Sequence, residues 1–149
     1  ILENVMVGAF ARTNSVDEAR KEAMRILEFV GLEGRAHLLA STLTLAGRKR
    51  LEVARALATK PDLILLDEVS AGLNPTEVEE MIRLLRQLAD MGIGSVAGVE
   101  HVMQVVMTIS DRVVVLNHGE LIAAGTPHEV VNNPAVIEAY LGGEVAHRA

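Results

Sequence analysis

The sequence LTLAGRKRLEVARALATKPDLILLDEVSAGLNP, residues 43–75, combines four features that suit the handling of phosphate groups. They are a glycine-containing turn at 43–47, a helix starting with Arg48, Lys49 and Arg50, an aliphatic strand ending in Asp67-Glu68, and a turn at 72–75. The N-terminus of a helix presents free N–H groups and a positive dipole end, so it attracts anions. Basic residues at this end indicate either a bound anion or a solvated amphipathic helix with a chance charge bias.

The acids at the end of the strand are the second informative feature. Residues 63–66 form a continuous aliphatic run, which is typical of a parallel strand covered on both faces. Asp67 and Glu68 follow it at the edge where open α/β sheets bind ligands. Asp67 could hold Mg²⁺ through its water shell, and Glu68 could orient or deprotonate a water that attacks a γ-phosphate. The alternative is that these acids only end the strand, since a buried strand must end at polar residues.

The composition favours a globular α/β domain and argues against several function classes. Half of the 149 residues are hydrophobic, and the net charge is -6. The chain has two Phe, one Tyr and no Cys, which excludes disulfides, cysteine-based zinc sites and thiol catalysis. Few aromatic side chains and a negative charge argue against binding to nucleic acid. No apolar run reaches bilayer length, and no signal peptide is visible.

The order of predicted elements alternates between helices and strands. Capping boxes are predicted at Ser15–Glu18 and Thr126–Glu129. For the helix after the loop at 72–75, Asn74 is the predicted N-cap, Pro75 the first helical position and Glu77 the N3 residue. The predicted helices cover 16–30, 47–59, 75–89 with its end at Gly92, 103–109 and 134–141. The predicted strands are 63–66 and 94–99, followed by a hairpin of 112–117 and 120–124 about His118-Gly119. We therefore expect a helical domain over residues 1–59 and a sheet-bearing domain over residues 60–149.

The succession of motifs resembles the back portion of ABC-type ATPases. In that family a signature turn precedes a helix ending in an ARAL-like run, then a proline, an aliphatic strand ending in Asp-Glu, a D-loop and a switch histidine. This chain carries the same order, with ARAL at 54–57, Pro61, the strand at 63–68, the loop at 71–75 and His101 after a strand ending at Val99. The resemblance implies a partial P-loop NTPase fold with a helical lobe, a parallel-sheet lobe and a C-terminal hairpin with helices.

The resemblance also implies a function for each matching residue. Thr44, Leu45, Ala46 and Gly47 would form the signature turn that reaches the γ-phosphate held by a partner subunit. Leu45 and Ala46 replace the two signature glycines, and Gly47 replaces its glutamine.

The remaining implied site residues follow the Walker B strand. Asp67 would face magnesium through water, Glu68 would be the catalytic base, and Asn74 would belong to the D-loop. His101 would sense the γ-phosphate, although a lone histidine at a strand end is also commonly structural.

Within the family, the chain is most similar to the ATPase subunits of branched-chain amino acid importers, because of its Gly-Leu-Asn-Pro loop and its ending GTPHEVVNNPAVIEAYLG. This likeness implies ATP and Mg²⁺ as cofactors. It implies a second ATPase subunit, in a homo- or heterodimer, and membrane permease subunits as partners, with no nucleic acid. The expected location is cytoplasmic, at the inner face of the cell membrane.

A P-loop of the form GxxxxGK[ST] is absent from these 149 residues, because none of the three lysines follows a glycine. The first residue is Ile1, and we expect a C-terminal segment whose P-loop lies upstream. We expect this segment alone to be inactive as an ATPase. The alternatives are a regulatory or binding module that hydrolyses nothing, and an ABC ATPase outside transport.

The opening ILENVMVGAF is apolar, with Glu3 as its only charge. Residues 1–43 carry no visible chemistry, and the resemblance places this opening after the Q-loop. We therefore expect a docking surface for a membrane permease in this helical lobe, with Val5, Met6, Val7 and Phe10 as its apolar residues. The alternative is that the apolar residues pack inside the helical lobe.

Overall fold

The computed structural model describes residues 1–88 and 93–139, which belong to two compact units, Ile1–Val99 and Glu100–Ala149. The domain boundary expected near Thr59 remains a prediction. None of the described helices has both the length and the apolar character needed to cross a membrane.

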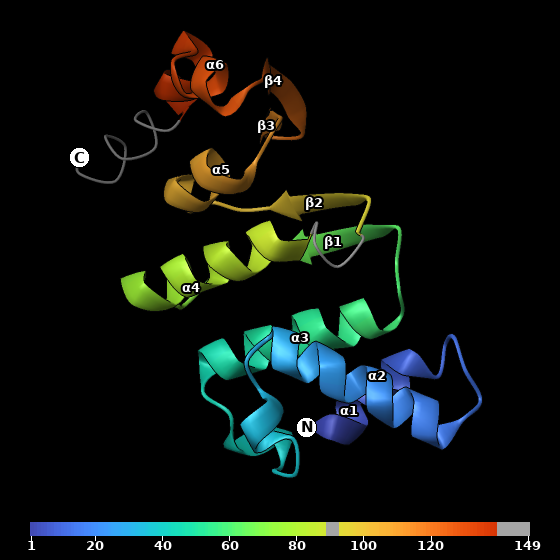
Figure 1. Ribbon diagram of the computed structural model, residues 1–149. Helices are drawn as coiled ribbons and strands as arrows, with labels where there is room; N and C mark the ends of the chain where they lie inside the picture. The colour runs from blue at the N-terminus through green and yellow to red at the C-terminus, as the bar shows by residue number, and fades with distance from the viewer. Residues whose placement is uncertain (89–92, 140–149) are drawn as a thin grey trace. The chain divides into compact units, whose positions relative to one another are not determined.

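Three helices pack against one another in the first unit: α1 (Leu2–Ala9), α2 (Val16–Phe29) and α3 (Leu45–Ala58) (Figure 1). Two short 3₁₀ turns, η1 (Glu33–Arg35) and η2 (Ala40–Thr42), connect α2 to α3. The packing of α1 on α3 depends on Gly8, because a Cβ there would lie 2.6 Å from the carbonyl oxygen of Arg55. The core of this unit is aliphatic, with fully buried Val5, Ile26 and Leu27.

The start of α2 lies where the sequence predicts it, but the predicted capping box is only half formed. The Ser15 hydroxyl accepts a hydrogen bond from the Glu18 N–H at 3.3 Å. The reciprocal bond from the Ser15 N–H goes instead to the Thr13 hydroxyl at 3.1 Å, and that hydroxyl donates to the Glu18 carboxylate. Thr13 thus stands between the two groups that a capping box would join directly.

The start of α3 is earlier than predicted. Thr44 is its N-cap, and its hydroxyl accepts from the Gly47 N–H at 3.2 Å. Leu45, Ala46 and Gly47 therefore form the first turn, and the prediction that Arg48 to Arg50 occupy it is wrong. A threonine cap satisfies a first-turn donor, so the helix begins as soon as the chain provides one.

A two-stranded parallel sheet follows, made of β1 (Leu63–Asp67) and β2 (Ser95–Val99), with Leu63 paired to Ser95 and Asp67 to Val99. The prediction that β1 is covered on both faces is wrong for the described chain. Ile64 is 3% exposed, whereas Leu65 is 74% exposed. Successive side chains of a strand point to opposite faces, and within the described chain only the face of Ile64 is covered.

Helix α4 (Pro75–Arg86) lies between the two strands in sequence. The predicted capping box is confirmed: Asn74 Oδ1 accepts from the Glu77 N–H, and Glu77 Oε2 accepts from the Asn74 N–H, each at 3.0 Å. The predicted end of this helix at 89–92 lies outside the described residues.

The second unit contains α5 (Met103–Ile109), the antiparallel hairpin β3 (Val113–Asn117) and β4 (Glu120–Gly125), and α6 (Pro127–Val131). His118 and Gly119 turn the hairpin with positive φ of 49° and 84°, the conformation that a two-residue hairpin favours. The capping box of Thr126 and Glu129 is confirmed. Residues 134–139 are helical, and the predicted end at Leu141 lies outside the described residues.

Candidate functional site

The carboxyl end of β1 places two exposed acids next to each other. Asp67 is the last residue of the strand, and Glu68 follows it with a positive φ of 45°. The left-handed region costs a residue with a side chain about 1 to 3 kcal/mol and persists only where the surroundings hold it. The Glu68 N–H donates to the Val99 carbonyl at 2.9 Å, and the Glu68 carbonyl accepts from the Ala71 N–H at 3.1 Å. Glu68 is thus held in a strained turn that leaves its side chain exposed.

The predicted signature turn is the N-terminus of α3. The Gly47 N–H is engaged by the Thr44 hydroxyl, and the Arg48 N–H donates to the Thr44 carbonyl at 2.9 Å. The N–H groups of Leu45 and Ala46 precede these bonds and point out of the first turn, as the first donors of a helix do. Gly47 is buried against Leu43, whose side chain lies 3.2 Å from the position that a Cβ would take.

The structure brings this first turn to the segment that follows β1. A Cβ on Gly72, whose φ is 78°, would lie 2.8 Å from Leu45 Cδ2, so the leucine side chain covers this glycine. One helical turn further along α3, Lys49 Nζ donates to the Glu68 carbonyl at 3.3 Å. The first two turns of α3 therefore contact the 68–72 segment within the first unit.

Asn74 lies at the end of the same loop, where its side-chain oxygen caps α4. The side chain therefore has a structural function in the described chain. This capping fixes where α4 begins after the loop of Gly72, and the predicted D-loop function of Asn74 is not tested by it.

His101 is exposed and lies between β2 and α5. It belongs to the second unit, near the start of that unit. Its assignment as a switch histidine remains a prediction.

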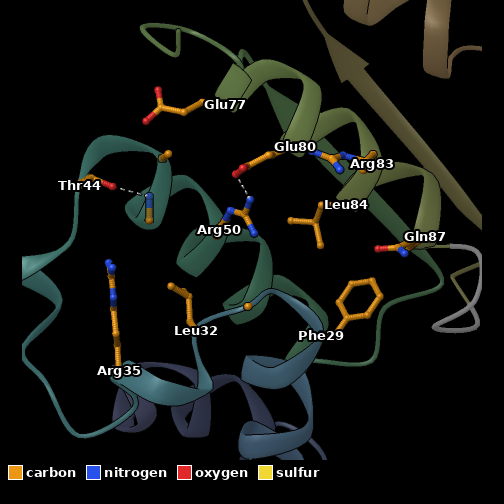
Figure 2. A pocket seen from close by; sticks show the side chains of 13 residues that line it. Phe29, Leu32, Arg35, Thr44, Arg50, Glu77, Glu80, Arg83, Leu84 and Gln87 are labelled. Atoms are coloured by element: carbon orange, nitrogen blue, oxygen red, sulfur yellow. Dashed lines mark hydrogen bonds and ion pairs between the residues drawn. The ribbon is translucent and has the colours of Figure 1, made fainter. Parts of the chain in front are cut away.

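A cleft of about 650 Å³ opens beside the first turn of α3 (Figure 2). Thr44, Ala46 and Gly47 form part of its wall, and its charged lining is Arg35, Arg50, Arg83, Glu77 and Glu80. Arg50 Nη2 lies 2.6 Å from Glu80 Oε2, and Arg50 Nη1 donates to the Val30 carbonyl at 3.1 Å. Three arginines against two glutamates leave the lining with one excess positive charge. Arg50 thereby joins the end of α2 and helix α4 through α3.

The apolar opening of the chain is divided between core and surface. Val5 and Met6 are buried in the helical packing, whereas Val7 is 69% exposed and Phe10 is 41% exposed. One side of α1 thus packs inside the unit and the other presents apolar surface, and the docking of a permease to that surface stays a prediction.

Two contacts of α3 were not anticipated from the sequence. The basic run 48–50 predicts either a bound anion or a solvated helix face, whereas in the structure Lys49 contacts the backbone after β1 and Arg50 is paired with Glu80. The signal available was the (i, i+4) spacing of Leu45 and Lys49, which places them on one side of a helix. Among the described residues, no group of three or more His, Cys, Asp or Glu side chains gathers to hold a metal ion.

Two family models match the chain. The model described as ABC transporter matches residues 2–71, and the model described as Branched-chain amino acid ATP-binding cassette transporter matches residues 120–146.

Characterised relatives agree with both models. The high-affinity branched-chain amino acid transport ATP-binding protein LivG of Salmonella typhimurium is 45% identical over 134 residues, which are 90% of this chain and 52% of LivG. BraF of Pseudomonas aeruginosa, with the same description, is 42% identical over 142 residues, 93% of this chain and 56% of BraF. The chain thus spans about half the length of these relatives.

Solved structures extend the likeness to the fold. The ADP conformation of MJ1267, an ATP-binding cassette of an ABC transporter, has a TM-score of 0.81 at 28% identity and covers 95% of this chain and 62% of that one. A nucleotide-free ATP-binding cassette has a TM-score of 0.80 at 27% identity, with coverage of 93% and 61%.

Proposed function

This chain belongs to the ATP-binding domains of ABC transporters, and from this membership we propose that it is part of an ATP-hydrolysing importer subunit. The solutes we propose are branched-chain amino acids, because the relatives LivG and BraF are described as ATP-binding proteins of that transport and because the ending matches the corresponding family model. The proposed partners are a second ATPase subunit and membrane permease subunits, with the protein at the inner face of the cell membrane.

The observation that carries the proposal is the pair of acids after β1. Asp67 and Glu68 are exposed side by side at the carboxyl end of a parallel strand, where α/β sheets bind ligands. The strained φ of 45° at Glu68 supports a function there, because a residue with a side chain is held in this region at a free-energy cost.

Mg²⁺ suits the donors that this end of β1 offers. The ion takes oxygen ligands, keeps several waters, and is often bound by one or two carboxylates together with substrate phosphates. Asp67 would hold the Mg²⁺ ion, and the bound ion would neutralise charge on the phosphates of ATP. The lack of a larger cluster of acids near Asp67 in the described residues is compatible with such a site.

Glu68 would accept a proton from the water that attacks the terminal phosphate. The N–H groups of Leu45 and Ala46 lie at the N-terminus of α3, the positive end of its dipole. They would stabilise the negative charge of a phosphate held by a second subunit. His101 would donate a hydrogen bond to the same phosphate, and Asn74 would connect the two sites of a dimer. A P-loop is needed to hold the β- and γ-phosphates, so the 149 residues alone are proposed to be inactive.

The test is Glu68→Gln in the protein expressed with the coding sequence upstream of Ile1. The carboxamide keeps the shape but cannot accept the proton, so we expect hydrolysis to fall by about 10²- to 10⁴-fold. ATP binding should persist, measured by equilibrium titration with a fluorescent nucleotide. Glu79→Gln, on the exposed side of α4, is the matched control and should keep wild-type turnover.

The outcome also separates this proposal from a module that only binds. An in-frame GxxxxGK[ST] upstream together with loss of turnover in Glu68→Gln supports hydrolysis at this site. ATP binding without turnover in the wild-type protein would support a regulatory module instead. Wild-type turnover in Glu68→Gln would move the base to another residue, with His101 as the next candidate.

A further inference from the structure

Lys49 connects the first turns of α3 to the strained residue after β1. Its ammonium group donates to the Glu68 carbonyl at 3.3 Å and lies 3.9 Å from Glu52 Oε2. The lysine side chain is only 19% exposed, although lysines usually extend into water. Leu45 lies four residues before Lys49 and covers Gly72, so one side of α3 contacts the 68–72 segment at two points.

The carbonyl that Lys49 holds belongs to the peptide unit that sets the direction of Glu68. With a φ of 45°, Glu68 needs its neighbouring peptide groups fixed, and the same carbonyl also accepts from the Ala71 N–H. A bond from a charged donor is stronger than one between neutral groups. Removing the Lys49 ammonium therefore removes a charge-assisted bond from the peptide that follows the Glu68 Cα.

We propose that Lys49 is a positioning residue for Glu68: by holding the Glu68 carbonyl from α3, it fixes where the exposed carboxylate lies. The same contact ties Glu68 to the helix whose first turn contains Thr44 to Gly47. This inference rests on the proposed function of Glu68 as the base. A lysine that only lies on the surface would leave both turnover and the 68–72 segment unaffected when it is replaced.

The test compares three variants in the protein expressed with its upstream coding sequence. Lys49→Met keeps the apolar stem and removes the donor, Lys49→Arg keeps a donor, and Lys21→Met removes an exposed lysine from α2. A misplaced catalytic group loses rate while substrate binding remains, so we expect kcat to fall about tenfold in Lys49→Met, with KM for MgATP changed less than about twofold. Lys49→Arg should recover part of kcat, and Lys21→Met should match the wild type.

Amide hydrogen exchange provides a second measurement that does not depend on turnover. In the 149-residue chain, Lys49→Met should exchange faster at Ala71 and Leu73, with α2 unchanged, and circular dichroism shows whether the variant is folded. A folded Lys49→Met variant with wild-type kcat and wild-type exchange would overturn the proposal that Lys49 positions Glu68. It would leave the proposed function of Glu68 standing. Absence of turnover in the wild-type protein would overturn the proposed function, and the positioning proposal with it.

Discussion

Glu68 combines an exposed carboxylate with a backbone conformation that favours glycine. Its N–H is bound to Val99, and its carbonyl accepts from Ala71 and Lys49, so these hydrogen bonds offset the cost of its positive φ. From the sequence, the position of these acids at the end of a strand can be predicted, because they directly follow an aliphatic run. It does not predict the φ of Glu68, since that angle depends on partners from β2 and α3 that lie far away along the chain.

This strain predicts an unusual order of stability at position 68. Glycine has no Cβ, so Glu68→Gly should be more stable than Glu68→Ala by about 1 kcal/mol. Urea unfolding of the 149-residue chain measures the difference. The same pair at Glu52, inside α3, should show the opposite order, because glycine is about 1 kcal/mol worse than alanine within a helix. The same order at both positions would show that Glu68 is not strained in solution.

At the scale of elements, the sequence predicts helix starts most closely where capping residues can be recognised in it. Asn74 and Thr126 begin α4 and α6 with complete capping boxes, as predicted. Helix α1 was not predicted, because its first residues provide no side-chain cap and no polar periodicity. The predicted start of α3 is too late, because the basic run 48–50 indicates a first turn only by its charge. Such a run shows charge but not where the N-cap is satisfied.

The contact between α1 and α3 predicts that Gly8 cannot accept a side chain. A Cβ would lie 2.6 Å from the Arg55 carbonyl oxygen and 2.9 Å from Ala58 Cβ, and neither backbone nor Cβ can rotate away. We expect Gly8→Ala to lower the free energy of unfolding by about 1 to 3 kcal/mol, despite the better helix propensity of alanine. Urea unfolding of the 149-residue chain is the measurement. Gly34→Ala is the control, because no atom lies within 4 Å of its added Cβ.

The cap of α6 predicts a dependence on pH in the second unit. Hydrogen bonds from the backbone N–H and the hydroxyl of Thr126 hold the pKa of the Glu129 carboxyl below its ordinary value of 4.5. A lowered pKa in the folded state means that the cap stabilises fully above the unfolded pKa and is lost as pH falls through the folded one. In an NMR titration of Glu129, Thr126→Val should raise the pKa of its carboxyl. An unchanged midpoint in Thr126→Val would contradict this.

At the scale of the whole molecule, the described chain presents apolar groups that its own packing does not cover. Leu65 on β1 and Val7 and Phe10 on and after α1 are exposed in the first unit. The sequence shows that these residues are apolar. It does not predict which of them are buried, because burial depends on which elements cover each face. Single exposed apolar residues are ordinary, whereas Val7 and Phe10 lie close together in sequence and form a candidate docking surface.

The docking hypothesis predicts a selective loss of transport. In the protein expressed with its upstream sequence and its permease, Phe10→Asp should abolish solute uptake while the ATPase activity of the isolated subunit is kept, because the ring is exposed and a charge there disrupts an apolar interface rather than the core. Val16→Asp is the control, since Val16 is exposed at the start of α2, where an acid is favourable. Uptake assays in cells and ATPase assays on purified subunit provide the two readouts. Unchanged uptake in Phe10→Asp would contradict docking at Phe10. Unfolding of that variant but not of Val16→Asp would show that Phe10 serves the packing of the subunit instead.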